Sequence, residues 1–207
     1  MVRIAVLVSG GGTNLQALID AQSRGELKNG RIAAVLSSRP DAYALERAAR
    51  AGIPGYVVAR KDFASNREMT VALVDKLREL NIGLVVLAGF LHILTGEMVA
   101  AFPNAILNAH PALIPSFCGA GYYGLHVHEA ALAYGVKLTG ATVHFVNEEP
   151  DGGPIVLQKA VEILEGDTPE VLQRRVMEQA EWHILPQAVS LFCEGRLRVE
   201  GRIVHIL

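Results

Sequence analysis

The sequence has few cysteines and aromatic residues and no long apolar run. Only two cysteines, Cys118 and Cys193, occur among 207 residues, which argues against a disulfide framework and favours a reducing compartment. No stretch approaches the roughly 20 consecutive apolar residues of a membrane span. The apolar residues 4–8 run straight into glycines and are too short for the core of a secretory signal. We therefore expect a soluble, cytoplasmic protein without a membrane partner.

A strong charge of either sign is also missing. Nineteen Lys and Arg residues face 21 Asp and Glu residues, and the formal net charge is −2. Nucleic-acid binding normally requires a clustered basic surface, so we expect no nucleic-acid partner. The short basic stretches at residues 174–175 and 196–198 are interpreted as solvated surface.

The overall composition is that of a folded globular domain. Hydrophobic residues make up 51% of the chain and charged residues 19%. A chain of this length can bury a substantial core without disulfides. No repeat, low-complexity tract or linker divides it. We predict a single domain over residues 1–207.

Apolar runs alternate with amphipathic segments in the first half of the chain. The patterns predict strands at residues 2–8, 31–36, 56–59, 82–88 and 105–107. They also predict one helix that begins near residue 15 and two more at 42–51 and 67–80. Alternation of this kind is typical of βαβ units with right-handed crossovers. The predicted fold class is α/β, a mostly parallel twisted sheet with helices on both faces.

The second half is more mixed. Residues 111–124 are rich in Pro, Gly and Tyr and are predicted to form a loop, followed by a short helix at 127–133. Strands are predicted at 141–146 and 155–163. A long helix should begin at Pro169 and run toward 194–195 with a break near Pro186. Residues 197–206 are interpreted as a hairpin that turns at Glu200-Gly201.

A glycine loop follows the first predicted strand, with the sequence Ser9-Gly10-Gly11-Gly12-Thr13-Asn14. A loop between a strand and a helix presents backbone N–H groups at the edge of the sheet, where a phosphate binds well. Leu15 stands where a dinucleotide fingerprint needs its third glycine, and no P-loop lysine follows. The loop thus favours a mononucleotide phosphate. The alternative, a tight turn that needs a positive φ, explains one glycine rather than three.

A second motif, Asn108-Ala109-His110-Pro111, lies at the carboxyl end of the fifth predicted strand, where open α/β sheets bind their ligands. Strand alternation puts Asn108 and His110 on one face, as an amide donor beside a group that titrates near neutral pH. A capping asparagine and a surface histidine would fit the bare pattern as well.

The third motif is Asp151-Gly152-Gly153-Pro154, an acidic residue on a glycine turn between two predicted strands. An ordinary hairpin turn with Asp at its first position is the alternative reading. His144, in the strand predicted before this turn, could line the ligand-binding site or pack in the core.

Cys118, His126 and His128 form a C-x₇-H-x-H pattern in the predicted loop and the helix after it. No fourth ligand accompanies them at the usual zinc spacing, so we expect no metal.

The motifs come in the order found in a known family. They are Ser-Gly-Gly-Gly-Thr-Asn-Leu-Gln (9–16), Leu-Ala-Gly-Phe-Leu-His-Ile-Leu (87–94), Asn-Ala-His-Pro-Ala-Leu-Ile-Pro (108–115) and Thr-Val-His-Phe-Val (142–146) with Asp-Gly-Gly-Pro (151–154). Together they resemble the folate-dependent formyltransferases, and the glycine loop resembles the phosphoribosylglycinamide formyltransferases (glycinamide ribonucleotide transformylases) in particular. The resemblance covers nearly the whole chain.

The resemblance implies the formyltransferase fold, with a Rossmann-like, nucleotide-phosphate-binding half at about residues 1–104. The catalytic and folate-binding half follows at about residues 105–207, and the active site lies in the cleft between them. The implied reaction transfers the formyl group of 10-formyltetrahydrofolate to the amine of 5'-phosphoribosylglycinamide in de novo purine biosynthesis, by direct attack through a tetrahedral intermediate. Only small-molecule substrates and a monomer or homodimer are expected.

The resemblance also implies the roles of individual residues. The implied catalytic residues are Asn108, His110 and Asp151. The nucleotide substrate would be held by Gly11, Gly12, Thr13, Asn14 and Glu181. The folate would be held by Arg67, Leu91, His92, Ile93, Leu94, Asn108, Asn147, Glu148, Glu149, Pro150 and Asp151. The chain departs from the family in having Leu91-His92 for the usual Met-Arg and a longer segment at 117–124.

The expected mechanism needs a donor aimed at an oxyanion and a relay for a proton. We expect Asn108 to donate to the oxyanion, and Asp151 to orient the ring of His110 and raise its pKa. The nearest alternative is a hydrolase that releases formate from the same folate, though hydrolases of this family carry a further domain before the catalytic one. A formyltransferase acting on initiator tRNA would have an extra C-terminal domain and a basic surface. A non-catalytic binding module would not need the three residues together, and the glycine spacing disfavours a dehydrogenase.

Overall fold

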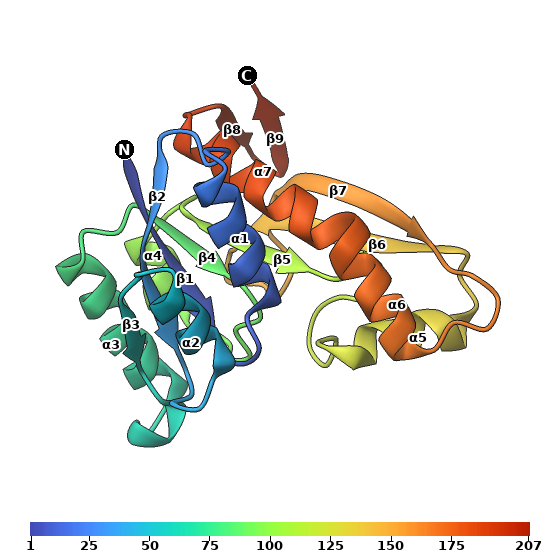
Figure 1. The fold of residues 1–207 in the computed structure, drawn as a ribbon, viewed down its shortest axis with the longest axis horizontal. Helices are drawn as coiled ribbons and strands as arrows, with labels where there is room; N and C mark the ends of the chain where they lie inside the picture. The colour runs from blue at the N-terminus through green and yellow to red at the C-terminus, as the bar shows by residue number, and fades with distance from the viewer.

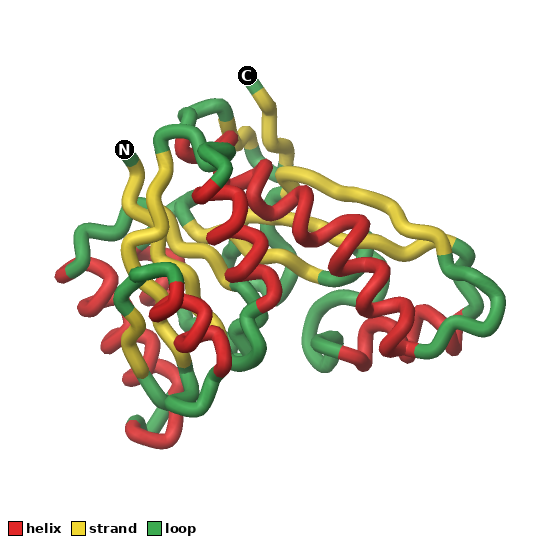
Figure 2. Tube along the Cα trace, viewed as in Figure 1, coloured by secondary structure: helices red, strands yellow, loops and turns green.

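One nine-stranded sheet runs through the molecule in the order β3-β2-β1-β4-β5-β6-β7-β9-β8 (Figures 1 and 2). The computed structural model describes residues 1–207. Pairing is parallel from β3 to β5, antiparallel from β5 through β6 to β7, parallel between β7 and β9, and antiparallel between β9 and β8. The strands are β1 (Val2–Val8), β2 (Gly30–Ser37), β3 (Gly55–Val57), β4 (Leu84–Leu87), β5 (Ile106–His110), β6 (Leu138–Phe145), β7 (Ile155–Glu162), β8 (Leu197–Glu200) and β9 (Ile203–Ile206).

Helices cover both faces of this sheet, and their positions explain the unbroken apolar run of β1. Ile4 and Val6 face a core built with α1, α2, α6 and α7, while Ala5 and Leu7 face a second core built with α3 and α4. The helices are α1 (Thr13–Ser23), α2 (Tyr43–Arg50), α3 (Asn66–Glu79), α4 (Gly96–Ala101), α5 (Leu125–Tyr134), α6 (Pro169–Val176) and α7 (Trp182–Cys193), with a 3₁₀ turn η1 (Arg60–Asp62) and a π-helical turn η2 (Met177–Glu181). A strand buried on both faces needs apolar side chains at every position.

The predicted α/β fold with a mostly parallel sheet is confirmed, whereas the predicted break near Pro186 is wrong. Pro186 lies inside α7, and the long helix is interrupted earlier, at the π-helical turn η2. Proline has no N–H and crowds the carbonyl four residues before it, so a widened turn just upstream gives its ring room. The short helix α4 had no clear periodic signal and was not predicted.

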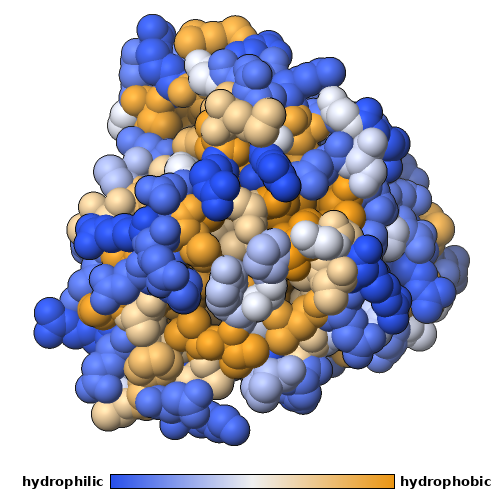
Figure 3. Space-filling model, turned by 60° about the vertical axis from the view of Figure 1, so that its left-hand side comes forward, coloured by the Kyte–Doolittle hydropathy of each residue, from blue (hydrophilic) through white to orange (hydrophobic).

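Apolar and polar side chains are mixed on the face of the molecule in Figure 3. On the face in Figure 3, orange apolar residues lie among blue hydrophilic side chains, which is usual for a folded protein. None of the helices combines the length and the apolar character that a membrane crossing requires.

The carboxyl ends of the parallel strands bring the glycine loop, the segment after β4 and the Asn108–His110 motif to one edge of the sheet. β1 lies between β2 and β4, and β4 lies beside β5. The glycine loop, which follows β1, therefore lies near the segment that follows β4 and near the end of β5. Open α/β sheets bind their ligands at such a place, where the direction of strand addition reverses.

Candidate active site

Gly12, the last glycine of the loop, has a left-handed backbone conformation and no room for a side chain. Gly12 precedes α1 with a φ of 71°, and a Cβ atom there would lie 2.6 Å from the Cβ of Ala44 on α2. At Gly10 and Gly11 an added Cβ would meet nothing within 4 Å. The loop is thus closed by packing on the α2 side and open on the other side.

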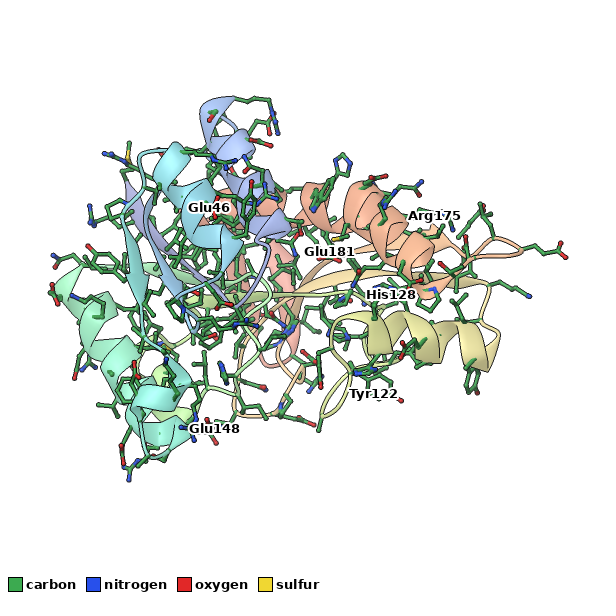
Figure 4. The ribbon with its side chains drawn as sticks, turned by 60° about the horizontal axis from the view of Figure 1, so that its bottom comes forward. Glu46, Tyr122, His128, Glu148, Arg175 and Glu181 are labelled. Atoms are coloured by element: carbon green, nitrogen blue, oxygen red, sulfur yellow. The ribbon has the colours of Figure 1, made fainter.

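Thr13 and Asn14, the first two residues of α1, are both in contact with the η2 segment. Asn14 donates from Nδ2 to Oε2 of Glu181 at 2.6 Å, and both side chains are buried. Figure 4 shows Glu181 between the sheet and the N-terminal part of the chain. Burial raises the pKa of the Glu181 carboxyl, and the hydrogen bond from Asn14 offsets this only in part. The structure therefore brings Glu181 directly to the glycine loop.

Ser9 links this loop to the segment that follows β4. Its hydroxyl shares a buried 2.7 Å hydrogen bond with the hydroxyl of Ser38 and accepts the backbone N–H of Leu91 at 3.0 Å. Two of the regions identified in the sequence are thus connected through one buried side chain.

The catalytic residues predicted from the sequence converge at the end of β5. The antiparallel register places Asn108 opposite His144 and His110 opposite Thr142 on β6. The Nδ2 atom of Asn108 lies 3.1 Å from Nε2 of His144 and 3.4 Å from Oδ1 of Asp151. His144 Nδ1 lies 2.8 Å from the carbonyl oxygen of Phe145. Because a carbonyl only accepts, Nδ1 carries the proton and Nε2 accepts from Asn108.

His110 is held on both sides of its ring. Nε2 lies 2.8 Å from the carbonyl oxygen of Phe117, and Nδ1 lies 3.5 Å from Oδ2 of Asp151. The carbonyl fixes the proton on Nε2, so Nδ1 is the nitrogen that gains or loses a proton, and it faces the carboxylate.

Asp151 is presented by a strained turn. Its φ is 55°, in the left-handed region, and a side chain on Gly153 would collide with the carbonyl of Phe145. The backbone N–H of Gly119 donates to Oδ2 of Asp151 at 2.8 Å. The loop after β5 therefore holds His110 through Phe117 and Asp151 through Gly119.

The charges of the cluster differ from the expectation in one respect. Burial lowers the pKa of His110, and the charge of Asp151 and the hydrogen bond with Phe117 raise it only in part. Asp151 therefore raises the pKa of His110, as expected, but the net pKa lies below the ordinary value because the cost of burying the imidazolium is larger. Burial also opposes ionisation of Asp151, yet the nearby rings of His144 and His110 and the Gly119 N–H together lower its pKa.

A pocket of about 140 Å³ adjoins this cluster. Its wall contains most of the residues that the resemblance assigned to the folate, together with His144 and three apolar side chains that were not assigned. Arg67 and Leu91 do not line it: Arg67 is exposed and paired with Glu97, and Leu91 is 59% exposed. The lining residues are Leu87, Phe90, His92, Ile93, Leu94, Asn108, His144, Val146, Asn147, Glu148, Glu149, Pro150 and Asp151.

Several residues of the site had no sequence signal of their own. Phe117 and Gly119 act through backbone atoms, which no side-chain pattern reports. For His144 the sequence left the cleft and the core open; it is buried and lines the pocket beside the cluster, and only the register shows which residue of β5 it meets. Arg47 donates from Nε to the carbonyl oxygen of Gly11 at 2.8 Å, yet it looks like an ordinary basic residue of an amphipathic helix.

Cys118, His126 and His128 have separate surroundings. Cys118 donates from its thiol to the carbonyl of Pro115 at 3.3 Å, and His126 is exposed and lies 3.0 Å from Glu129. His128 is fully buried on α5, and neither of its ring nitrogens has a partner. Burial lowers the pKa of His128 to about 4. No group of three or more metal-ligating side chains is found in the structure.

Comparison with known proteins gives concordant results. A family model described as formyl transferase matches residues 2–189. A curated phosphoribosylglycinamide formyltransferase from Haemophilus influenzae is 45% identical over 206 residues, covering 100% of this chain and 94% of the relative.

Solved structures agree with the sequence comparison. The crystal structure of glycinamide ribonucleotide transformylase 1 from Symbiobacterium toebii matches with a TM-score of 0.94 and 48% identity over 100% of this chain and 94% of that chain. A formyltetrahydrofolate deformylase from Pseudomonas syringae matches with a TM-score of 0.87 and 26% identity, over 100% of this chain and 66% of that chain.

Proposed function

Because the chain belongs to the formyl transferase family, we propose that it transfers the formyl group of 10-formyltetrahydrofolate to the amine of 5'-phosphoribosylglycinamide. This reaction is a step of purine biosynthesis. The whole-chain similarity to phosphoribosylglycinamide formyltransferases supports this acceptor.

The observation that carries the proposal is the convergence of Asn108, His110 and Asp151 beside a pocket. The carboxylate of Asp151 lies within 3.5 Å of polar atoms on both other residues. The glycine loop, which suits a phosphate, lies at the same edge of the sheet and is linked through Ser9 to the segment after β4. Acyl transfer between nitrogens requires hydrogen-bond donors for the oxyanion, a proton acceptor and a site for each of the two substrates.

Attack of the acceptor amine on the formyl carbon forms a C–N bond and turns the carbonyl oxygen into an oxyanion. Asn108 is the donor for this oxygen. One of its amide hydrogens is held by His144 at 3.1 Å, whereas the other has only the 3.4 Å contact with Asp151 and is the easier one to redirect. Removal of such a donor costs about 2.7–4 kcal/mol of barrier in comparable sites.

Proton transfer completes the reaction. The lowered pKa of His110 leaves its ring neutral near pH 7, with an unprotonated Nδ1 beside Asp151. Nδ1 accepts the proton that the attacking nitrogen loses, and the carboxylate stabilises the imidazolium that forms. The proton then passes to the folate nitrogen as its bond to the formyl carbon breaks.

We propose that the two halves of the one domain divide the substrates. Residues of about 1–104 hold the nucleotide phosphate at Gly11 to Asn14, with Glu181 of the second half close to the sugar hydroxyls. Residues of about 105–207 carry the chemistry and much of the folate pocket, whose apolar wall and backbone suit a flat heterocycle. Arg67 and Leu91 do not line this pocket, so they would contact the folate only at the rim of the pocket.

The decisive experiment mixes the protein with 10-formyltetrahydrofolate, with and without 5'-phosphoribosylglycinamide, and follows loss of the formyl-folate and formation of both products. We expect loss only with the nucleotide present, and one formylated nucleotide for each folate consumed.

A second candidate, hydrolysis of the formyl-folate, is suggested by the similarity to the formyltetrahydrofolate deformylase. Equal release of formate with and without nucleotide would establish the hydrolase instead. No loss of formyl-folate in either mixture would reject both enzymes in favour of a binding protein.

A further inference from the structure

Residues of α2 donate hydrogen bonds to one side of the glycine loop. The backbone N–H of Ala44 donates to the carbonyl oxygen of Gly10 at 3.1 Å, and Arg47 donates from Nε to the carbonyl oxygen of Gly11 at 2.8 Å. Two successive carbonyls of the loop are therefore turned toward α2. In a trans peptide the N–H points away from the carbonyl, so the N–H groups of Gly11 and Gly12 point away from α2.

These N–H groups form no hydrogen bond within the fold. The N–H groups of Gly11, Gly12, Thr13 and Asn14 donate to no acceptor within the protein. Successive free N–H groups at a helix start form a concave nest for an anion. The direction of this nest is fixed by the two bonds that hold the carbonyls on the opposite side.

Arg47 brings a positive charge close to the loop, on the side of its carbonyl groups. It forms no ion pair with any carboxylate, in contrast to Arg50 on the next turn, which pairs with Glu46. Its Nη1 donates to Oε1 of Gln16 at 3.0 Å, and its guanidinium lies 5.0 Å from the centre of the Tyr43 ring. With Thr13 and Gln16 it lines a pocket of about 320 Å³ beside α1.

We propose that Arg47 is a positioning residue that sets the affinity for the phosphomonoester of the nucleotide substrate. It turns the Gly11 carbonyl away, which aims the N–H groups outward, and its uncompensated charge favours a dianion next to the loop. The planar fork of arginine reaches Gly11 and Gln16 at once, which lysine does not do. This inference rests on the proposed function for the identity of the substrate.

The test compares Arg47→Gln and Arg47→Lys with Arg50→Gln as the matched control. Arg50 is on the same helix but pairs with Glu46, whose exposed position on α2 is seen in Figure 4. For Arg47→Gln we expect the KM for the nucleotide to rise about tenfold, with kcat and the KM for the folate within about twofold. Arg47→Lys should fall between the wild type and Arg47→Gln, and Arg50→Gln should match the wild type.

Two further measurements separate a phosphate effect from a general structural one. The dissociation constant of inorganic phosphate, followed by phosphorus NMR, should rise in Arg47→Gln by a factor similar to that of the nucleotide KM. The acceptor without its phosphate, glycinamide riboside, should be used equally well by the wild type and Arg47→Gln.

The inference is overturned if the nucleotide KM of Arg47→Gln stays within twofold of the wild type, or if kcat falls while that KM is unchanged. It is also overturned if the riboside is affected as strongly as the nucleotide. Absence of formyl transfer by the wild type would reject the proposed function, whereas the phosphate titration would still decide the role of Arg47.

Discussion

The glycine loop and the catalytic cluster represent two ways of building a polar site. The loop offers main-chain N–H groups from residues adjacent in sequence, Gly11 to Asn14. The cluster consists of side chains from β5, β6 and the turn after β6, and each is held by a further partner. A main-chain site depends on backbone conformation, whereas a side-chain cluster depends on strand register and on individual functional atoms.

The two sites also differ in their response to pH. Backbone N–H groups do not titrate, so the loop presents the same donors at every pH. In residues 105–207, burial lowers the pKa of His110 and of His128, and polar contacts and charges outweigh burial to lower the pKa of Asp151. Changes in protonation should therefore affect the cluster of Asn108, His110 and Asp151 before they affect the glycine loop.

The largest effect is expected at Asp151. Asp151→Asn keeps the shape of the side chain but removes the charge that stabilises the His110 imidazolium. We expect kcat to fall about 10³-fold while the KM for the nucleotide stays within about twofold. Steady-state kinetics with both substrates measure this, with Asp75→Asn on the exposed side of α3 as the control. A kcat close to that of the wild type would remove Asp151 from the mechanism.

Gly12→Ala tests the other kind of site through its backbone. The added Cβ would lie 2.6 Å from the Cβ of Ala44, at a φ of 71°. Left-handed strain and overpacking together should lower the free energy of unfolding by about 2–4 kcal/mol. Urea denaturation measures this, and Gly10→Ala, whose Cβ meets nothing within 4 Å, is the control. Equal stability of the two variants would contradict the packing of α2 on the loop.

His128 provides a pH test confined to residues 105–207. Its folded pKa of about 4 lies below the ordinary value of 6.5, so the unfolded chain binds the proton first as pH falls. Stability should be lost progressively below pH 6.5, by about 2 kcal/mol between pH 7 and pH 5 from this group alone. His128→Leu should show a drop smaller by this amount when urea unfolding is compared at both pH values. The same drop in the variant and the wild type would mean that His128 is not buried as described.

The smallest effect is expected at Thr13. Its hydroxyl has only a 3.5 Å contact with the sulfur of Met177, so it is free to bind a phosphate. Thr13→Ala should raise the KM for the nucleotide about three- to tenfold and leave kcat unchanged, while Thr13→Ser should behave like the wild type. A fall in kcat at constant KM would oppose a role in binding. Asn14→Ala is less informative, because it also removes the partner of buried Glu181.

Much of the fold could be predicted because its signals are local. Continuous apolar runs indicated the buried parallel strands. Serine is a preferred residue before a helix, and Ser65 caps α3 by accepting the N–H of Glu68 at 3.1 Å. Proline is the visible signal for a break in the last long helix, but the interruption lies upstream of Pro186, at the π-helical turn Met177–Glu181.

The sequence alone determined the alternation of strands and helices, the glycine loop and the identity of the residues at the end of β5, because these depend on neighbours along the chain. Only the tertiary structure decided that Asn108 faces His144, that Phe117 and Gly119 hold His110 and Asp151, and that burial outweighs the carboxylate in setting the pKa of His110. Register and desolvation depend on segments that meet from far apart in the chain, and local residue patterns carry no measure of either.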